Sequence, residues 1–125
     1  MMAGQEQSCH LALLVRSSPC TGRETRAEVD LALAALALDF SLEIYFFGDA
    51  VLQLAKDKTG AGALVPGGYK AWAALPELGD VTVYAESAWT ARCERAGVEW
   101  LLPVEQLGPA RMKNAWRQCD RVVVL

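Results

Sequence analysis

The chain has 125 residues, of which 53% are hydrophobic and 22% charged, with a formal net charge of −3. This length suits one domain with a substantial core. The longest apolar stretches, such as residues 31–38, are far shorter than the roughly 20 residues that span a bilayer. The absence of a run of Lys or Arg argues against direct binding of nucleic acid through its phosphates.

The first residues are short and polar and lack the features of a signal peptide. We therefore expect a disordered N-terminal tail over residues 1–8 and a single domain over residues 9–125. We expect the protein to be cytoplasmic, with no membrane association.

Five apolar runs have the length and the flanking residues of β-strands. They are His10–Val15, Leu42–Phe47, Val81–Tyr84, Val98–Leu102 and Arg121–Leu125. The runs are nearly continuous, which is typical of strands covered on both faces in a parallel sheet. On the same reasoning, we expect the last strand to be central or covered on both faces.

Helical patterns lie between these strands. Residues 22–39 contain no proline, and apolar residues recur there at spacings of three and four: Ala27, Leu31, Ala34, Ala35 and Leu38. Asp49 can cap a helix that runs through Ala55, and Ser87 can cap another that stops at Gly97. A last helix is indicated by a stripe of four residues: Met112, Ala115, Trp116 and Cys119.

The alternation of strands and helices predicts an α/β fold, a three-layer α/β/α sandwich with a mainly parallel five-stranded sheet. Residues 56–68 are rich in glycine and are predicted to form a mobile loop. These glycines follow a helix instead of the first strand, so they do not form a dinucleotide-binding fingerprint. The sequence therefore indicates no nucleotide and no other cofactor.

The four cysteines form no Cys-x-x-Cys pair, and the only histidine is His10. This spacing predicts free thiols and no metal site. Cys93 and Cys119 fall on apolar helix faces and are expected to be small buried residues. Cys9, at the end of the tail, has no predicted role.

The turn after the first strand contains the candidate catalytic residue. Thr21 and Glu24 have the spacing of a capping box, so a helix is expected to begin at Gly22. Cys20 would then lie just before a helix N-terminus at the carboxyl edge of the sheet, where open α/β folds bind ligands. The helix dipole would favour its thiolate. The alternative is that Cys20 is a small residue that fills the turn, because no histidine or acid is placed beside it by spacing.

Three polar residues complete the candidate ligand-binding set. Ser17 and Thr21 lie in the same turn as Cys20, and Asp49 follows the tip of the second strand. For Asp49, the alternative interpretation is a helix N-cap.

Four segments resemble a known family. They are Ser17-Ser-Pro after the first strand, the helix start Gly22-Arg-Glu, the stretch Tyr45–Leu54 (YFFGDAVLQL) and the closing Cys119–Leu125 (CDRVVVL). Over about residues 9–125 the chain resembles the TusC/DsrF subunits of the DsrE-like sulfur-relay proteins. The stretch Tyr45–Leu54 is the most specific of these similarities.

The resemblance implies a cytoplasmic complex with homologous TusB-like and TusD-like (DsrH-like and DsrE-like) subunits, arranged as a dimer of heterotrimers. Such a complex accepts persulfide sulfur and passes it to a downstream sulfur carrier protein. The pathway leads to 2-thiolation of the wobble uridine in tRNA or serves dissimilatory sulfur oxidation.

In the family, the transferable sulfur is held on a cysteine just after the third strand of the TusD/DsrE subunit. The corresponding stretch here, Val81–Ala88, reads VTVYAESA and has no cysteine. This departure favours a non-catalytic subunit. The main alternative is a standalone DsrE-like sulfurtransferase that uses Cys20, and a flavodoxin-like binder of a small ligand is a third possibility.

Overall fold

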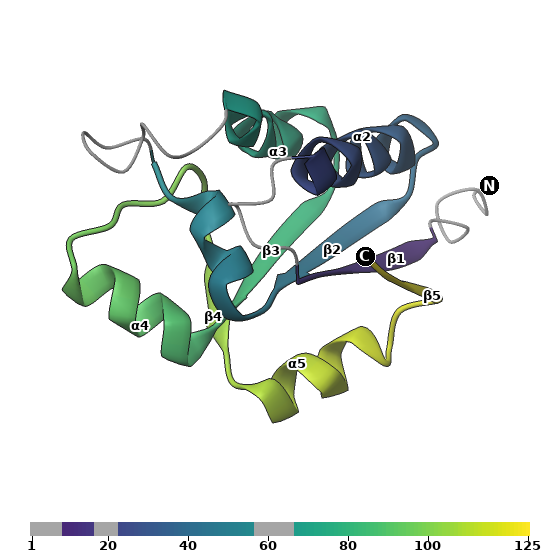
Figure 1. Ribbon diagram of the computed structural model, residues 1–125. Helices are drawn as coiled ribbons and strands as arrows, with labels where there is room; N and C mark the ends of the chain where they lie inside the picture. The colour runs from purple at the N-terminus through teal and green to yellow at the C-terminus, as the bar shows by residue number, and fades with distance from the viewer. Residues whose placement is uncertain (1–8, 17–22, 57–66) are drawn as a thin grey trace.

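A five-stranded parallel sheet forms the centre of the molecule (Figure 1). The computed structural model describes residues 9–16, 23–56 and 67–125. The strands are β1 (His10–Val15), β2 (Ser41–Phe46), β3 (Val81–Glu86), β4 (Glu105–Leu107) and β5 (Arg121–Val124). Their order is β4-β3-β2-β1-β5, and each neighbouring pair is parallel.

The helices cover the sheet from two sides. Between β1 and β3 lie α2 (Arg23–Ala37), the 3-10 helices η2 (Gly48–Leu54) and η4 (Gly67–Ala74), and the short α3 (Leu75–Leu78). After β3 come α4 (Ser87–Arg95) and α5 (Pro109–Trp116). In Figure 1, α2 and α3 lie above the sheet and α5 lies below it. The predicted three-layer α/β/α fold with a parallel sheet is confirmed.

Side-chain alternation along the strands separates two unequal cores. On the α2 side, Leu13, Ile44 and Phe46 are fully buried in a large cluster that also includes Trp72. On the α5 side, the buried cluster consists of only four residues: Ala12, Leu14, Tyr45 and Met112. The predicted stripe on the last helix contributes to this second cluster, because Ala115, Trp116 and Cys119 pack against it.

The structure corrects the predicted buried face of α2. Its buried residues are Glu28, Val29, Ala32, Ala35 and Leu36. Of the five stripe residues predicted, only Ala35 is buried, and Leu38 is 72% exposed. Both faces of this helix carry apolar side chains at helical spacing, so periodicity alone did not identify the face that contacts the sheet.

The predicted strand Val98–Leu102 is also wrong. In this segment Trp100 forms an isolated antiparallel bridge to Ala55, and the Leu101 N–H donates to the Leu54 carbonyl at 2.8 Å. The apolar side chains of the segment pack against the large core, while its backbone bonds to the end of η2. The fourth strand is instead the polar Glu105–Leu107.

The last strand lies at an edge of the sheet. β5 pairs with β1 only, and Val122 and Val124 are 41% and 56% exposed. The expectation of a central or doubly covered strand is therefore wrong. α5 rests over β1 and β2 and leaves this edge open on its side of the sheet.

Gly97 ends α4, as predicted. Its φ is +86°, its N–H donates to the Glu94 carbonyl, and the Val98 N–H donates to the Cys93 carbonyl. This is the Schellman pattern, in which a left-handed residue satisfies the last helical carbonyls.

The position of β5 changes the expected effect of an acidic substitution there. Val123 is half-buried against the large core. Val123→Asp should therefore lower the free energy of unfolding by about 1–3 kcal/mol without preventing folding. Val122→Asp, at the exposed neighbouring position, should change it by no more than about 0.5 kcal/mol. Urea unfolding followed by circular dichroism measures both, and an unfolded Val123→Asp protein would contradict the edge position.

Candidate functional site

The candidate site is the carboxyl edge of the sheet. Because the strands are parallel, the segments that follow them meet at this edge. The described residues there are Arg16 after β1, the turn Phe47–Asp49 after β2, and Glu86 with Ser87 at the end of β3 (Figure 1). Ser17, Cys20 and Thr21 lie outside the described residues, in the connection between β1 and α2.

A hydrogen bond joins the ends of β2 and β3. The Gly48 N–H donates to Glu86 Oε1 at 2.8 Å. Gly48 has a φ of +57°, which residues other than glycine rarely adopt, so the turn depends on glycine. The Glu86 carboxylate is thereby fixed at the edge, half-buried, where the chain enters α4.

Helix α4 begins directly after this carboxylate. Glu86 is the N-cap residue, no side chain caps the helix, and the Thr90 hydroxyl donates to the Glu86 carbonyl at 2.8 Å. Ser87, predicted to be the cap, is instead the first helical residue. Its hydroxyl lies 4.0 Å from the position of a Cβ at Gly108, so the segment after β4 also reaches this edge.

Asp49 lies in the first turn of η2 and is half-buried. The N-cap of η2 is Phe47, without a side-chain hydrogen bond, so the alternative interpretation of Asp49 as an N-cap is wrong. The expected helix is a 3-10 helix that begins one residue earlier, at Gly48. Asp49 remains a candidate ligand-binding residue beside the Gly48–Glu86 contact.

The described cysteines lie away from the turn after β3. Cys93 is buried in α4, as predicted, and its pKa is raised by burial and by the Glu94 charge. Cys119 was predicted to be buried on the face of the last helix, but it lies after the end of α5 and is half-buried. Burial, a hydrogen bond with the Glu43 carboxylate and the charge of that carboxylate raise its pKa to about 12. Both side chains are neutral thiols at physiological pH, and a thiol is a poor nucleophile.

The sequence did not predict a buried set of hydrogen-bonded polar side chains on the α2 side of the sheet. Trp72 Nε1 donates to Gln53 Oε1 at 3.1 Å, and Gln53 Nε2 lies 3.4 Å from Glu28 Oε1. All three side chains are buried. Glu28 was missed because its helix face was expected to face solvent. Glu86 was missed because a carboxylate at the end of a strand has no distinctive sequence pattern.

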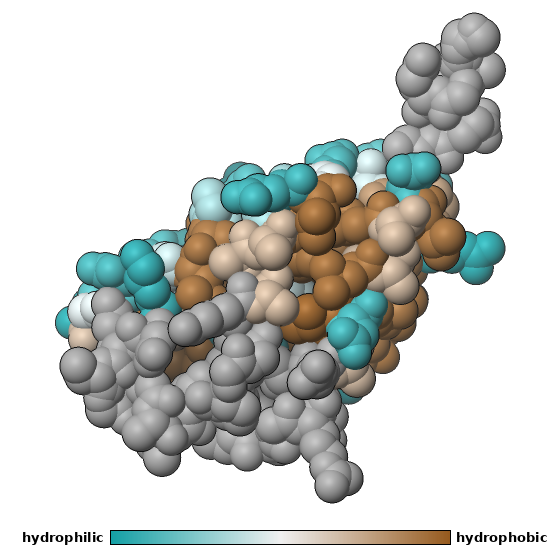
Figure 2. All heavy atoms as spheres, turned by 90° about the horizontal axis from the view of Figure 1, so that it is seen from above, coloured by the Kyte–Doolittle hydropathy of each residue, from teal (hydrophilic) through white to brown (hydrophobic). Residues whose placement is uncertain are grey.

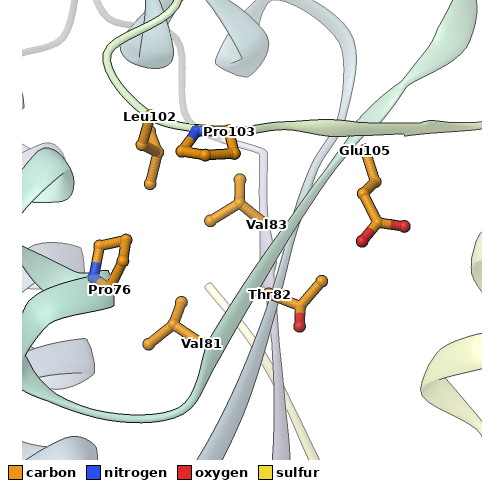
Figure 3. Close-up of a pocket in the computed structure, with 7 residues that line it drawn as sticks. All are labelled: Pro76, Val81, Thr82, Val83, Leu102, Pro103 and Glu105. Atoms are coloured by element: carbon orange, nitrogen blue, oxygen red, sulfur yellow. The ribbon is translucent and has the colours of Figure 1, made fainter.

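A small crevice lies beside β3, and none of the polar side chains named above lines it. Its volume is about 160 Å³, and Figure 3 shows it between Pro76, the start of β3 and the segment Leu102–Glu105. It exists because β4 pairs only with Tyr84–Glu86, so the first half of β3 has no strand beside it on that side, while β2 pairs with it on the other. Glu105 is its only charged lining residue, so the crevice offers mainly apolar contact.

Within residues 9–16, 23–56 and 67–125, no group of three or more His, Cys, Asp or Glu side chains is arranged to hold a metal ion. In the same part of the chain, no helix is long and apolar enough to cross a membrane.

Comparison with known proteins identifies the class. The sequence profile of the DsrE/DsrF-like family matches residues 10–125, and the chain belongs to this family. The crystal structure of the YchN protein from E. coli superposes with a TM-score of 0.75. The match covers 94% of this chain and 99% of YchN at 15% sequence identity, so it supports the fold alone. No curated protein matches the sequence.

Family membership connects the chain to sulfur-relay proteins. The turn after β3 differs from the TusD/DsrE subunits of the resemblance, because it contains no cysteine. The family position for the sulfur-carrying cysteine falls just after the third strand. Here Ala85 and Glu86 end β3, and Ser87 and Ala88 begin α4. The turn after β3 therefore contains a carboxylate and a hydroxyl and no thiol.

The raised pKa of Cys119 predicts slow alkylation. At pH 8, iodoacetamide should modify Cys119 on the order of a thousandfold more slowly in the folded protein than in urea, because the thiolate forms only as the pH approaches about 12. Glu43→Gln removes the carboxylate charge, lowers the pKa of Cys119 and should accelerate its alkylation. Peptide mass spectrometry resolves each cysteine. Equal rates in the folded and unfolded chains would contradict this account.

Proposed function

We propose that this chain is a subunit of a sulfur-relay complex that does not itself carry the persulfide. The observation that supports this most strongly is the turn after β3, where Glu86 and Ser87 replace the cysteine of the catalytic subunit. The Glu86 carboxylate is held in place by the Gly48 N–H. A fixed negative charge raises the free energy of a second anion beside it, and a persulfide is an anion at neutral pH. This edge is therefore poorly suited to hold sulfur.

The partners that we propose are homologous TusB-like and TusD-like (DsrH-like and DsrE-like) subunits, with the persulfide on the TusD-like one. An apolar patch on the outer layer supports this proposal. It consists of Ala27, Leu31 and Ala34 on α2, Leu38 directly after its end, and Leu78 on α3. Figure 2 shows apolar side chains gathered over this layer. Soluble monomers seldom expose such a patch, and a stable partner would cover at least about 1,000 Å².

In this proposal the complex works in the cytoplasm and passes sulfur to a downstream carrier protein. The destination is 2-thiolation of the wobble uridine in tRNA or, in sulfur oxidisers, dissimilatory sulfur oxidation. The chain itself contacts neither nucleic acid nor a membrane.

The second candidate function is a standalone sulfurtransferase that uses Cys20. Its support is topological. Val15 ends β1 and Arg23 begins α2, so residue 20 belongs to the connection between them at the carboxyl edge. In this connection, a thiol beside the start of a helix of 15 residues would have a lowered pKa.

The variant Cys20→Ser distinguishes the two candidate functions. Co-expressed with its homologous partners, the chain should form one hexameric species, and persulfide should be found on the partner's cysteine only. Cys20→Ser should leave sulfur transfer to the carrier unchanged, measured in a single turnover with labelled sulfur. Loss of transfer in an intact hexamer would establish Cys20 as part of the relay and overturn the scaffold proposal.

The apolar patch gives a separate test. Leu31→Lys combined with Leu38→Lys should abolish co-purification with the partner subunits, because two charges would be buried in the interface. The isolated variant should keep its circular dichroism spectrum, since both side chains are exposed in the chain alone. Val122→Lys, an exposed apolar position on β5, is the matched control and should co-purify normally. Co-purification of the double variant would place the partners elsewhere.

A further inference from the structure

A second polar region lies on the α5 face of the sheet, beside the C-terminal end of α5. Three neighbouring strands contribute His10 from β1, Glu43 from β2 and Tyr84 from β3, and these enclose a pocket of about 310 Å³ with Ala115 and Gln118. The His10 N–H donates to Asp120 Oδ2 at 2.8 Å, and the Asp120 N–H donates to the His10 carbonyl at 2.9 Å. This pair of bonds holds the start of β1 against the segment that follows α5.

The Glu43 carboxylate lies half-buried in this region. It accepts a hydrogen bond from the Tyr45 hydroxyl at 2.5 Å and another from the Cys119 thiol. Both donors are neutral. Among the described residues the ion pair observed joins Lys56 to Glu99, so no Lys, Arg or His there lies within ion-pair distance of Glu43. Buried carboxylates are usually paired with a cation, because desolvation otherwise disfavours the charge.

The charge of Glu43 raises the pKa values of the titratable side chains around it. The Glu43 charge contributes to the raised pKa values of Tyr45, Tyr84 and Cys119, after burial as the largest cause. All three groups therefore stay neutral at physiological pH. Glu43 is the acidic residue of the described lining, which contains no Lys or Arg.

An aromatic wall accompanies this charge. The Tyr84 ring stacks on Tyr45 with centroids 4.8 Å apart and an interplanar angle of 13°, and Trp116 packs edge-on against Tyr45. Tyr84 is thus held rigidly at the pocket, and an electron-rich ring attracts a cation placed over its face. Gln118 adds an amide oxygen that can accept a hydrogen bond from the same ligand.

We propose that this pocket binds an organic cation, a guanidinium or primary ammonium group, with Glu43 as its counter-ion and the Tyr84 ring as its cation–π partner. The volume is at the lower end of the range for small-ligand sites, so it fits one such group and a short chain. The cation can belong to a small molecule or to an arginine side chain of a protein. This proposal is independent of the sulfur-relay function, which concerns the carboxyl edge.

Titration with agmatine, followed by NMR of the folded chain, tests the proposal. Agmatine should shift the amide signals of residues 10, 43, 84, 115 and 118, whereas N-butylurea, a neutral probe with a similar planar head group, should not. Binding of a capped arginine amide in addition to agmatine would indicate a protein side chain as the natural ligand. Binding of agmatine alone would indicate a small molecule.

Variants identify the residues responsible. Glu43→Gln should weaken agmatine binding at least about tenfold, because the amide keeps a similar shape but not the charge. Tyr84→Leu should weaken it about 2- to 30-fold. Glu77→Gln, an exposed acid on α3 across the sheet, should have no effect.

Three results would overturn the proposal: no shifts with agmatine in the unmodified chain, equal binding of N-butylurea, or unchanged affinity in folded Glu43→Gln. Should Glu43→Gln fail to fold, the comparison of agmatine with N-butylurea in the unmodified chain still decides whether charge is recognised.

Discussion

Parallel pairing of β1, β2 and β3 is the constraint on which the rest of the structure depends. It brings the connections that follow these strands to one edge, so that Gly48 after β2 meets Glu86 at the end of β3. His10, Glu43 and Tyr84 share the α5 face because side chains alternate along each strand, and the register offsets each from the next by two residues. Both polar regions described here follow from this one arrangement. One is the carboxyl edge with Gly48 and Glu86, and the other is the Glu43 pocket beside α5.

The two faces of the sheet differ in what covers them. The α2 side buries a large apolar core and leaves its outer helix surface apolar as well, with Leu38 and Leu78 exposed. The α5 side has a small core and a half-buried carboxylate. Both features fit the proposed assembly. A partner subunit would cover the apolar surface of α2 and α3, and the α5 side would recognise a charged group.

The fold could be predicted from the sequence because the apolar runs 10–15, 42–47 and 81–84 are short, nearly continuous and separated by helical patterns. Details that depend on tertiary contact could not be predicted. Leu31 and Leu38 are as apolar as Val29 and Leu36, and only packing against the sheet decides which pair is buried. The run 98–102 satisfies the pattern of a strand, but its backbone bonds to η2 instead. The position of β5 at an edge depends on strand order, which local sequence does not contain. The Glu43 pocket had one available signal, a carboxylate inside the otherwise apolar run 42–47.

The central claim is that this chain supports sulfur transfer without carrying sulfur, and the intact mass of the purified chain tests it most directly. After incubation with a persulfide donor, the chain should show no added sulfur atom that a reducing thiol removes. Two of the three described cysteines support this expectation, because the pKa values of Cys93 and Cys119 are raised and both remain thiols. A stoichiometric gain of one reducible sulfur, located at Cys20 by peptide mapping, would contradict the account and identify the chain as a carrier in its own right.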